Sequence, residues 1–170
     1  MRLFIAFKVP AEAMHELQKQ ISFEGIKLVK DFHCTLKFLG EVDEDKVGDI
    51  IKKLRSISFQ KIDARFGKIG TFPHVIWIGL LPEDEICTLQ QQIDDALVSF
   101  FPKNERFAPH VTLGRAQSIK ADNNIQHALK NKKTPPAAFA IDEFCLIRSE
   151  LQQSGPVYSI IERFMCLPSH

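Results

Sequence analysis

The chain has 170 residues, of which 45% are hydrophobic and 25% are charged, and its formal net charge at pH 7 is +1. A chain of this length and balance buries enough surface to fold as an ordinary globular protein. The near-zero charge argues against a broad polyanion-binding surface, such as a protein that coats duplexes would carry. A small site for one phosphate needs only a few donors, so that possibility stays open.

The cysteine pattern bears on compartment and metal content. The chain has four cysteines: Cys34, Cys87, Cys145 and Cys166. They include no C-x-x-C pair, which argues against a zinc site. Cys34 and Cys145 lie in apolar, strand-like runs, where a cysteine usually behaves as a small buried hydrophobe. We therefore expect free thiols in a reducing compartment. The N-terminal apolar run is too short for a signal peptide and no run approaches a membrane span, so we expect a cytoplasmic protein with no membrane partner.

Strand and helix patterns recur along the whole chain. The expected elements, in chain order, are a strand at 3–9, a helix at 11–21, a strand at 32–39, a helix from Asp43 to Ile57, strands at 62–69 and 75–80, a helix at 82–100, a strand at 110–115, a helix at 119–129, and strands at 137–147 and 158–164. Neighbouring strands with helices between them favour an α+β fold with largely antiparallel sheets. No long Gly/Ser linker divides the chain.

A short internal repeat stands out. His33-Cys-Thr-Leu36 recurs 77 residues later as His110-Val-Thr-Leu113. This spacing, a little under half the chain, is expected if two similar lobes each present one strand to a shared cleft. We therefore expect residues 1–170 to form one domain of two lobes.

Each copy of the repeat offers one imidazole and one hydroxyl on the same face of a strand. Side chains alternate along a strand, so the first copy divides into two sets, with His33, Thr35 and Lys37 on one face and Cys34, Leu36 and Phe38 on the other. In the second copy the same period places His110 and Thr112 together, opposite Val111 and Leu113. One face of each strand is polar and the other suits a core.

Two basic residues lie close to these motifs. Lys37 shares the parity of His33, although a lysine on a half-exposed strand is usually only solvated. Arg115 has the wrong parity relative to His110 in a regular strand. It reaches the face of His110 only if Gly114 permits a bulge or the strand ends there.

The paired motifs suit the opening of a cyclic phosphodiester. This reaction needs a base that takes a proton from water and an acid that protonates the departing ribose oxygen on the far side of phosphorus. Histidine titrates near neutral pH, so one ring can be neutral while the other is charged. The hydroxyls of Thr35 and Thr112 can bind the non-bridging oxygens, and Arg115 and Lys37 can add positive charge. A chance H-x-T is common, but two copies in strand-like runs, both followed by Leu, favour this interpretation.

Other site types have less support. A metal site would need three or four ligands, and no H-x-x-x-H or neighbouring carboxylate pattern supplies them, so we expect no metal and no cofactor. Ser149 and Ser154 lie in no G-x-S-x-G context, which argues against a serine hydrolase.

Beyond these patterns, the chain resembles the 2H phosphoesterases, and within them the bacterial and archaeal RNA 2′,3′-cyclic phosphodiesterases, also called 2′–5′ RNA ligases. The similarity covers nearly the whole length and is carried by four segments: Met1–Ala6, His33–Gly40, Phe107–Arg115, and Gly155–Tyr158 with Arg163–Phe164. The chain departs from the family at Cys34, where an aliphatic residue is more usual, and at Asp31–Phe32, where Asn-Leu is more usual.

The resemblance implies a pseudo-symmetric two-lobed α+β fold, with antiparallel sheets around a central cleft and helices outside. It implies hydrolysis of a terminal 2′,3′-cyclic phosphate to a 2′-phosphate, with His33 as proton donor and His110 as proton acceptor. Thr35, Thr112 and Arg115 would bind the phosphate. The implied partners are RNA 3′ ends or oligonucleotides with a cyclic phosphate.

Three alternatives keep the same residues. One is the joining of RNA ends by a 2′–5′ bond, and another is hydrolysis of a different small cyclic nucleotide phosphate. The third is a nucleotide-binding scaffold without turnover, which the presence of both histidines and both threonines disfavours. Nothing in the sequence demands more than a monomer.

Overall fold

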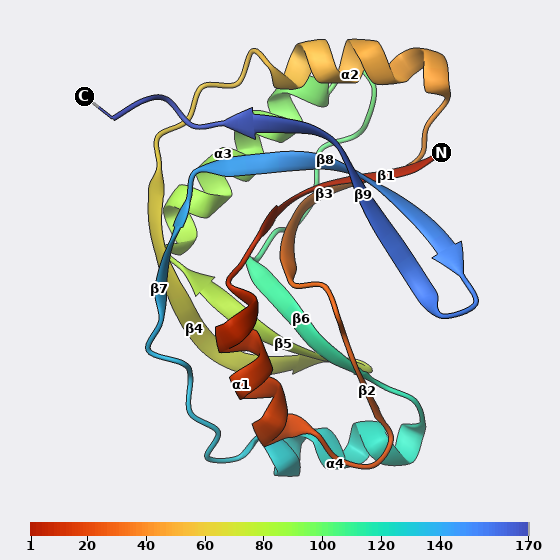
Figure 1. The fold of residues 1–170 in the computed structure, drawn as a ribbon, viewed down its shortest axis with the longest axis vertical. Helices are drawn as coiled ribbons and strands as arrows, with labels where there is room; N and C mark the ends of the chain where they lie inside the picture. The colour runs from red at the N-terminus through yellow and green to blue at the C-terminus, as the bar shows by residue number, and fades with distance from the viewer. Residues whose placement is uncertain (170) are drawn as a thin grey trace.

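The structure is a computed structural model that describes residues 1–169, without the side chains of Asp122 and Gln126. It contains two sheets, one with strand order β3-β1-β8-β9 and one with strand order β2-β6-β5-β4-β7 (Figure 1). The elements are β1 (Arg2–Lys8), α1 (Ala11–Ile21), β2 (Ile26–Leu28), β3 (His33–Glu41), η1 (Glu44–Lys46), α2 (Val47–Leu54), β4 (Ile62–Phe72), β5 (Val75–Leu81), α3 (Glu83–Leu97), β6 (His110–Ala116), α4 (Ile119–Leu129), β7 (Ala138–Ile141), β8 (Glu143–Gln152) and β9 (Gly155–Met165). Each strand pair formed by the described residues is antiparallel, so the predicted α+β fold is confirmed.

Each half of the chain contributes strands to both sheets. In the first half, β1 and β3 pair with each other, but β4 pairs with β5 in the other sheet. In the second half, β6 pairs with β5, but β8 returns to pair with β1. This exchange of strands interlocks the two halves of the chain.

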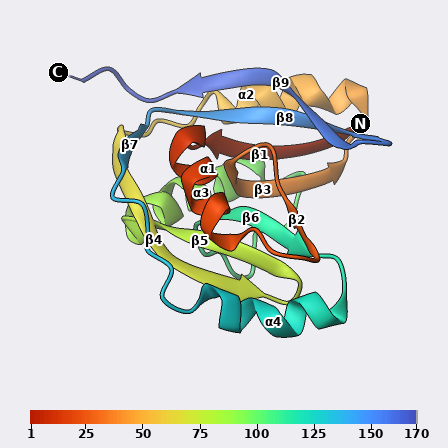
Figure 2. The same cartoon turned by 60° about the horizontal axis from the view of Figure 1, so that its bottom comes forward.

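The motif strands β3 and β6 lie next to each other where the two sheets meet. Figure 2 shows the four-stranded sheet above the five-stranded sheet, with α4 below the latter. Helix α3 packs against both β3 and β5, because its buried face points inward through Ile86, Leu89, Ile93 and Leu97. One continuous hydrophobic core joins residues of both sheets and of the helices.

Helix α1 fixes the position of β6. Its apolar residues Met14, Leu17 and Ile21 are fully buried. The buried Gln18 between them donates from its amide to the carbonyl oxygens of Val29 (2.8 Å) and Leu113 (3.0 Å). Leu113 belongs to the second motif, so a polar contact of α1 holds that strand in place.

Several predicted elements have other bounds in the structure; the helix expected from Asp43 to Ile57, for example, is the short η1 followed by α2, which ends at Leu54. The single strand expected at 137–147 is divided at Asp142 into β7 and β8, which lie in different sheets. The short strand β2 was not predicted, since three residues carry too little periodic signal. The final strand begins at Gly155, earlier than expected, and forms a long hairpin with β8.

The cysteine prediction is confirmed, because all four cysteines are free thiols. No helix among residues 1–169 is both long and apolar enough to cross a membrane.

Candidate active site

The two H-x-T motifs come together across the junction of the sheets. His33 opens β3 and His110 opens β6, and these two strands are in contact. The buried thiol of Cys34 lies against the backbone N–H of His110; burial outweighs this contact and raises the pKa of Cys34 to about 12. Cys34, the neighbour of His33 in the first motif, therefore contacts the histidine of the second motif directly.

The predicted alternation of faces holds within each motif. His33 and Thr35 are half-buried while Cys34 and Leu36 are fully buried. In β6, His110 and Thr112 are likewise half-buried, and the two residues that follow them are inside the core: Val111 and Leu113.

A bulge changes the alternation at the same place in both strands. On β3, Thr35 is paired with Ala6 and Lys37 with Ile5, so one residue of β3 is passed over between consecutive partners. On β6, the equivalent step passes over Leu113. A single inserted residue exchanges the two faces of a strand beyond it.

The bulge changes the expected positions of Lys37 and Phe38 and bears on that of Arg115. Lys37 does not share the face of His33 but is 2% exposed, and Phe38 does not enter the core but is 70% exposed. Those two predictions from regular alternation were wrong. Arg115 was expected to reach the face of His110 only if Gly114 permits a bulge or the strand ends there, and a bulge that passes over Leu113 lies directly before Gly114.

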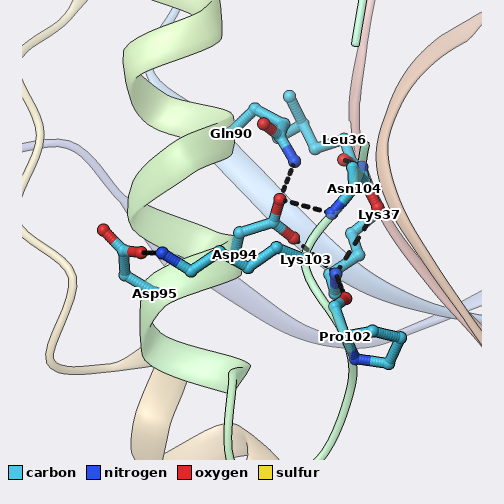
Figure 3. Close-up of polar contacts among 8 residues, drawn as sticks. All are labelled: Leu36, Lys37, Gln90, Asp94, Asp95, Pro102, Lys103 and Asn104. Carbon is cyan, nitrogen blue, oxygen red and sulfur yellow. Dashed lines mark hydrogen bonds and ion pairs between the residues drawn. The ribbon is translucent and has the colours of Figure 1, made fainter. Parts of the chain in front are cut away.

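The ammonium group of Lys37 lies in a buried polar network (Figure 3). It forms an ion pair with Asp94 of α3 and donates to the carbonyl oxygen of Pro102 at 2.7 Å. Asp94 also accepts from the Gln90 amide at 2.7 Å and from the backbone N–H of Asn104 at 2.9 Å. The network thereby joins β3 to α3 and to the segment that leads into His110. A cavity of about 210 Å³ borders it, and none of the predicted site residues lines that cavity.

Both motif histidines are held through Nδ1 by an acceptor two residues earlier. His110 Nδ1 lies 2.7 Å from the carbonyl oxygen of Ala108, and His33 Nδ1 lies 3.0 Å from Oδ1 of Asp31. A carbonyl oxygen can only accept, so Nδ1 of His110 carries the hydrogen. The hydrogen bond from His33 is the main reason that the pKa of Asp31 is lowered, so this acceptor is a carboxylate. In both rings Nε2 is left as the atom that gains or loses a proton.

Aromatic rings flank each histidine. The ring centroid of His33 lies 5.1 Å from that of Phe4 and 5.3 Å from that of Tyr158. The centroid of His110 lies 5.3 Å from that of Phe72 and 6.2 Å from that of Trp77. These rings restrict the orientation of the imidazoles and line their surroundings with apolar surface.

The other predicted site residues have unused donors. The hydroxyls of Thr35 and Thr112 form no side-chain hydrogen bond with the described residues, and Arg115 is exposed without an ion pair to any of them. Burial raises the pKa of Tyr158, and the positive charge of Arg115 in the other lobe offsets part of this increase. Within the described side chains, no three His, Cys, Asp or Glu residues gather as a metal site would require.

Some residues at the site were not among the predicted site residues, and Asp31 and Tyr158 are two of them. Asp31 was noted only as a departure in the approach to the first motif, and its spacing of two residues from His33 is the signal that identifies it. Tyr158 stands in the Gly155–Tyr158 segment, and nothing in that segment alone places it against His33. That contact depends on the pairing of β8 with both β1 and β9.

Comparisons with known proteins identify the family of this chain. The family model of the 2′-5′ RNA ligase superfamily matches residues 6–153. The RNA 2′,3′-cyclic phosphodiesterase of Methanocaldococcus jannaschii is 34% identical, covering 96% of this chain and 100% of its own length. The protein of the same name from Thermotoga maritima is 31% identical, covering 95% of this chain and 93% of its own.

Two solved structures have the same fold over nearly their full lengths. LigT of E. coli complexed with 3′-AMP superposes with a TM-score of 0.78 at 25% identity, covering 98% of both chains. TT0787 of Thermus thermophilus superposes with a TM-score of 0.77 at 27% identity, covering 100% of both chains. Since the family model spans most of the chain and a full-length relative is more than 30% identical, this chain belongs to the 2′-5′ RNA ligase superfamily.

Proposed function

We propose that this protein hydrolyses the 2′,3′-cyclic phosphate at an RNA 3′ end to a 2′-phosphate, without a metal ion. The observation that carries the proposal is the pair of adjacent motif strands, each with one imidazole held through Nδ1 and one threonine hydroxyl beside it. The names of the relatives that are 31–34% identical support the same substrate class. Both motifs come from one chain, so the proposal needs no second copy, and the interlocked sheets suit a single domain over residues 1–170.

The reaction uses the two Nε2 atoms in opposite senses. Nε2 of His110 takes a proton from water as the water oxygen forms a bond to phosphorus. The bond between phosphorus and O3′ breaks, and Nε2–H of His33 donates its proton to O3′. The products are a 3′-hydroxyl and a 2′-phosphate, and one proton has passed from His33 to the product while His110 has gained one from water.

The remaining site residues stabilise charge that grows on the phosphate. The hydroxyls of Thr35 and Thr112 donate to the non-bridging oxygens, and the guanidinium of Arg115 lies on the same face as His110 because of the bulge. These donors are held by strands before the substrate arrives, so little reorganisation accompanies the reaction.

The direct test is hydrolysis of a short RNA that ends in a 2′,3′-cyclic phosphate, in the presence of EDTA. We expect full activity, with the product phosphate assigned to the 2′ position by ³¹P NMR. A strict need for added metal, or a 3′-phosphate product, would contradict the proposed mechanism. Binding of the RNA without turnover by the folded protein would instead support a scaffold role.

Replacing either histidine by alanine should abolish most of this activity. We expect His33→Ala and His110→Ala each to lower kcat by about 10²- to 10⁴-fold, since each removes one proton-transfer group. Circular dichroism and thermal unfolding should remain close to wild type, because both side chains lie at the surface end of their strands. Near-normal turnover in either variant would refute the paired acid–base assignment.

A further inference from the structure

The two motif histidines differ in the acceptor that holds Nδ1. At the same position in each motif, two residues before the histidine, His33 has a side-chain carboxylate and His110 has a backbone carbonyl. A carboxylate carries a full negative charge, whereas a carbonyl offers only a dipole. The two imidazoles are therefore oriented in the same way, but only His33 is hydrogen-bonded to a negatively charged group.

We propose that Asp31 is a positioning residue that orients His33 and stabilises its protonated form, the form in which His33 acts as proton donor. Its carboxylate fixes the ring through Nδ1 and offsets the positive charge that the ring carries while Nε2 is protonated. Ala108 fixes the other ring equally well but stabilises that charge less, which suits a histidine that must begin neutral. This inference rests on the proposed function, because it concerns the proton donor of that reaction.

The local structure holds Asp31 firmly against His33. The neighbouring residue Phe32 is 4% exposed, and its carbonyl accepts from the backbone N–H of Val9 at 3.2 Å, so the segment is tied to the end of β1. The second oxygen of Asp31 accepts from Lys8 Nζ at 3.2 Å, while the first faces His33. The side chains of His33 and Asp31 are 16% and 32% exposed, so solvent screens their interaction only in part.

Several other titratable groups lie near His33. The titratable groups that face it or its neighbours come from four segments of the chain: Asp31 before β3, Arg2 and Lys8 on β1, Tyr158 on β9 and Arg115 on β6. Lys8 is half-exposed and bound to the far oxygen of Asp31, so water and salt weaken its repulsion of the ring. Burial raises the pKa of Tyr158, so its hydroxyl is neutral at physiological pH. Asp31 is the one anionic group in direct contact with His33 among the described residues.

The sign of the pH dependence follows from this charge. The donor must be protonated at the start of the reaction, so activity falls on the alkaline side as the donor loses its proton. Removing a carboxylate that is bound to the ring favours the neutral ring, and the alkaline limb of the kcat/KM profile then moves to lower pH. The acid limb reports the base, and it should move much less because His110 has a different partner.

The experiment compares pH profiles of Asp31→Asn with those of the wild-type protein, using RNA that ends in a 2′,3′-cyclic phosphate. Asparagine keeps the shape and an oxygen acceptor for Nδ1–H but removes the charge. We expect the alkaline limb to move down by about one pH unit, and kcat/KM above neutral pH to fall about tenfold through kcat, with little change in KM. Asp31→Glu should recover part of the activity and the position of the alkaline limb.

The matched control is Asp63→Asn, the same chemical change on an exposed side chain of β4, which should leave the profile unchanged. A uniform loss at every pH with an unmoved alkaline limb would overturn the inference, because Asp31 would then only orient the ring. An unchanged profile in Asp31→Asn would overturn it as well. Either result leaves the proposed function intact, whereas an inactive wild-type protein contradicts the proposed function itself.

Discussion

In the first lobe the residue four positions after the motif histidine is Lys37, and in the second lobe it is Gly114. Both residues are buried, and each follows the β-bulge of its own strand, but their surroundings differ. The side chain of Lys37 extends to Asp94 and to the segment before β6, because β3 is the edge strand of its sheet (Figure 3). Gly114 lies against β2, which covers the equivalent edge of β6.

The comparison shows that the same backbone feature has different surroundings in the two motif strands. In both lobes the bulge brings the fifth residue after the histidine to the histidine's own face. That residue is Phe38 in the first lobe and Arg115 in the second, so the two lobes present an apolar ring and a cation at equivalent positions. The bulge is therefore common to both motif strands, whereas the side chain that follows it differs between the lobes.

The largest effect on stability should follow from removing the buried ion pair between Lys37 and Asp94 in the first lobe. Lys37→Met leaves the Asp94 carboxylate buried without its cation, and we expect the free energy of unfolding to fall by about 3–5 kcal/mol in urea titrations. The variant Lys103→Met removes an equivalent ion pair with Asp95, which is exposed, so its urea midpoint should stay close to wild type. A stability loss no greater than that of the control would show that the buried pair does not hold β3.

The same pair predicts a dependence of stability on pH. Burial alone would raise the pKa of Asp94, but the hydrogen bonds from Lys37, the Asn104 N–H and Gln90 outweigh it and hold the pKa below its ordinary value of 3.8. A depressed pKa stabilises the folded state above that value, and the stabilisation is lost as the pH falls through the folded pKa. The difference in stability between wild type and Lys37→Met should therefore shrink below about pH 4.

A smaller effect on stability should follow from disturbing the close contact between Gly114 and β2 in the second lobe. A Cβ on residue 114 would lie 2.9 Å from Cγ2 of Ile26 and 3.3 Å from the carbonyl oxygen of Lys27. Gly114→Ala should therefore push β2 away and lower the free energy of unfolding by about 1–3 kcal/mol. It should also raise KM, because Arg115 follows directly.

The control for this change is Gly48→Ala in the exposed part of α2, where an added Cβ has nothing within 4 Å. Alanine is the better helix former, so this variant should gain about 0.5–1 kcal/mol. If Gly114→Ala were also stabilising, the close approach of β2 would not be what requires glycine at that position.

The two bulges also mark the limit of what the sequence could predict. The faces of His33 and Thr35 follow from a period of two, and the structure has them as expected. Beyond Thr35 the same rule failed for Lys37 and Phe38, because a bulge depends on pairing with β1 and has no signature within β3 itself. In the second lobe the glycine at 114 made a bulge conceivable, so the position of Arg115 could be stated conditionally. The role inferred for Asp31 needed the observed contact with Nδ1, since spacing alone does not orient a carboxylate.

The smallest effect concerns the ring that the first bulge exposes. Phe38 packs 6.1 Å from Phe4, whose ring in turn contacts His33, so it lies within reach of a nucleoside bound at the motif. An exposed ring beside a phosphate site suits stacking with a base, and we expect Phe38→Ala to raise KM about five- to tenfold with little change in kcat. Phe100→Ala, a partly exposed ring beyond the end of α3, should leave KM unchanged. The decisive comparison uses an RNA whose terminal nucleotide lacks its base: the wild-type and Phe38→Ala proteins should then have the same KM, and a persisting difference would mean that Phe38 acts on the fold of the strand rather than on the base.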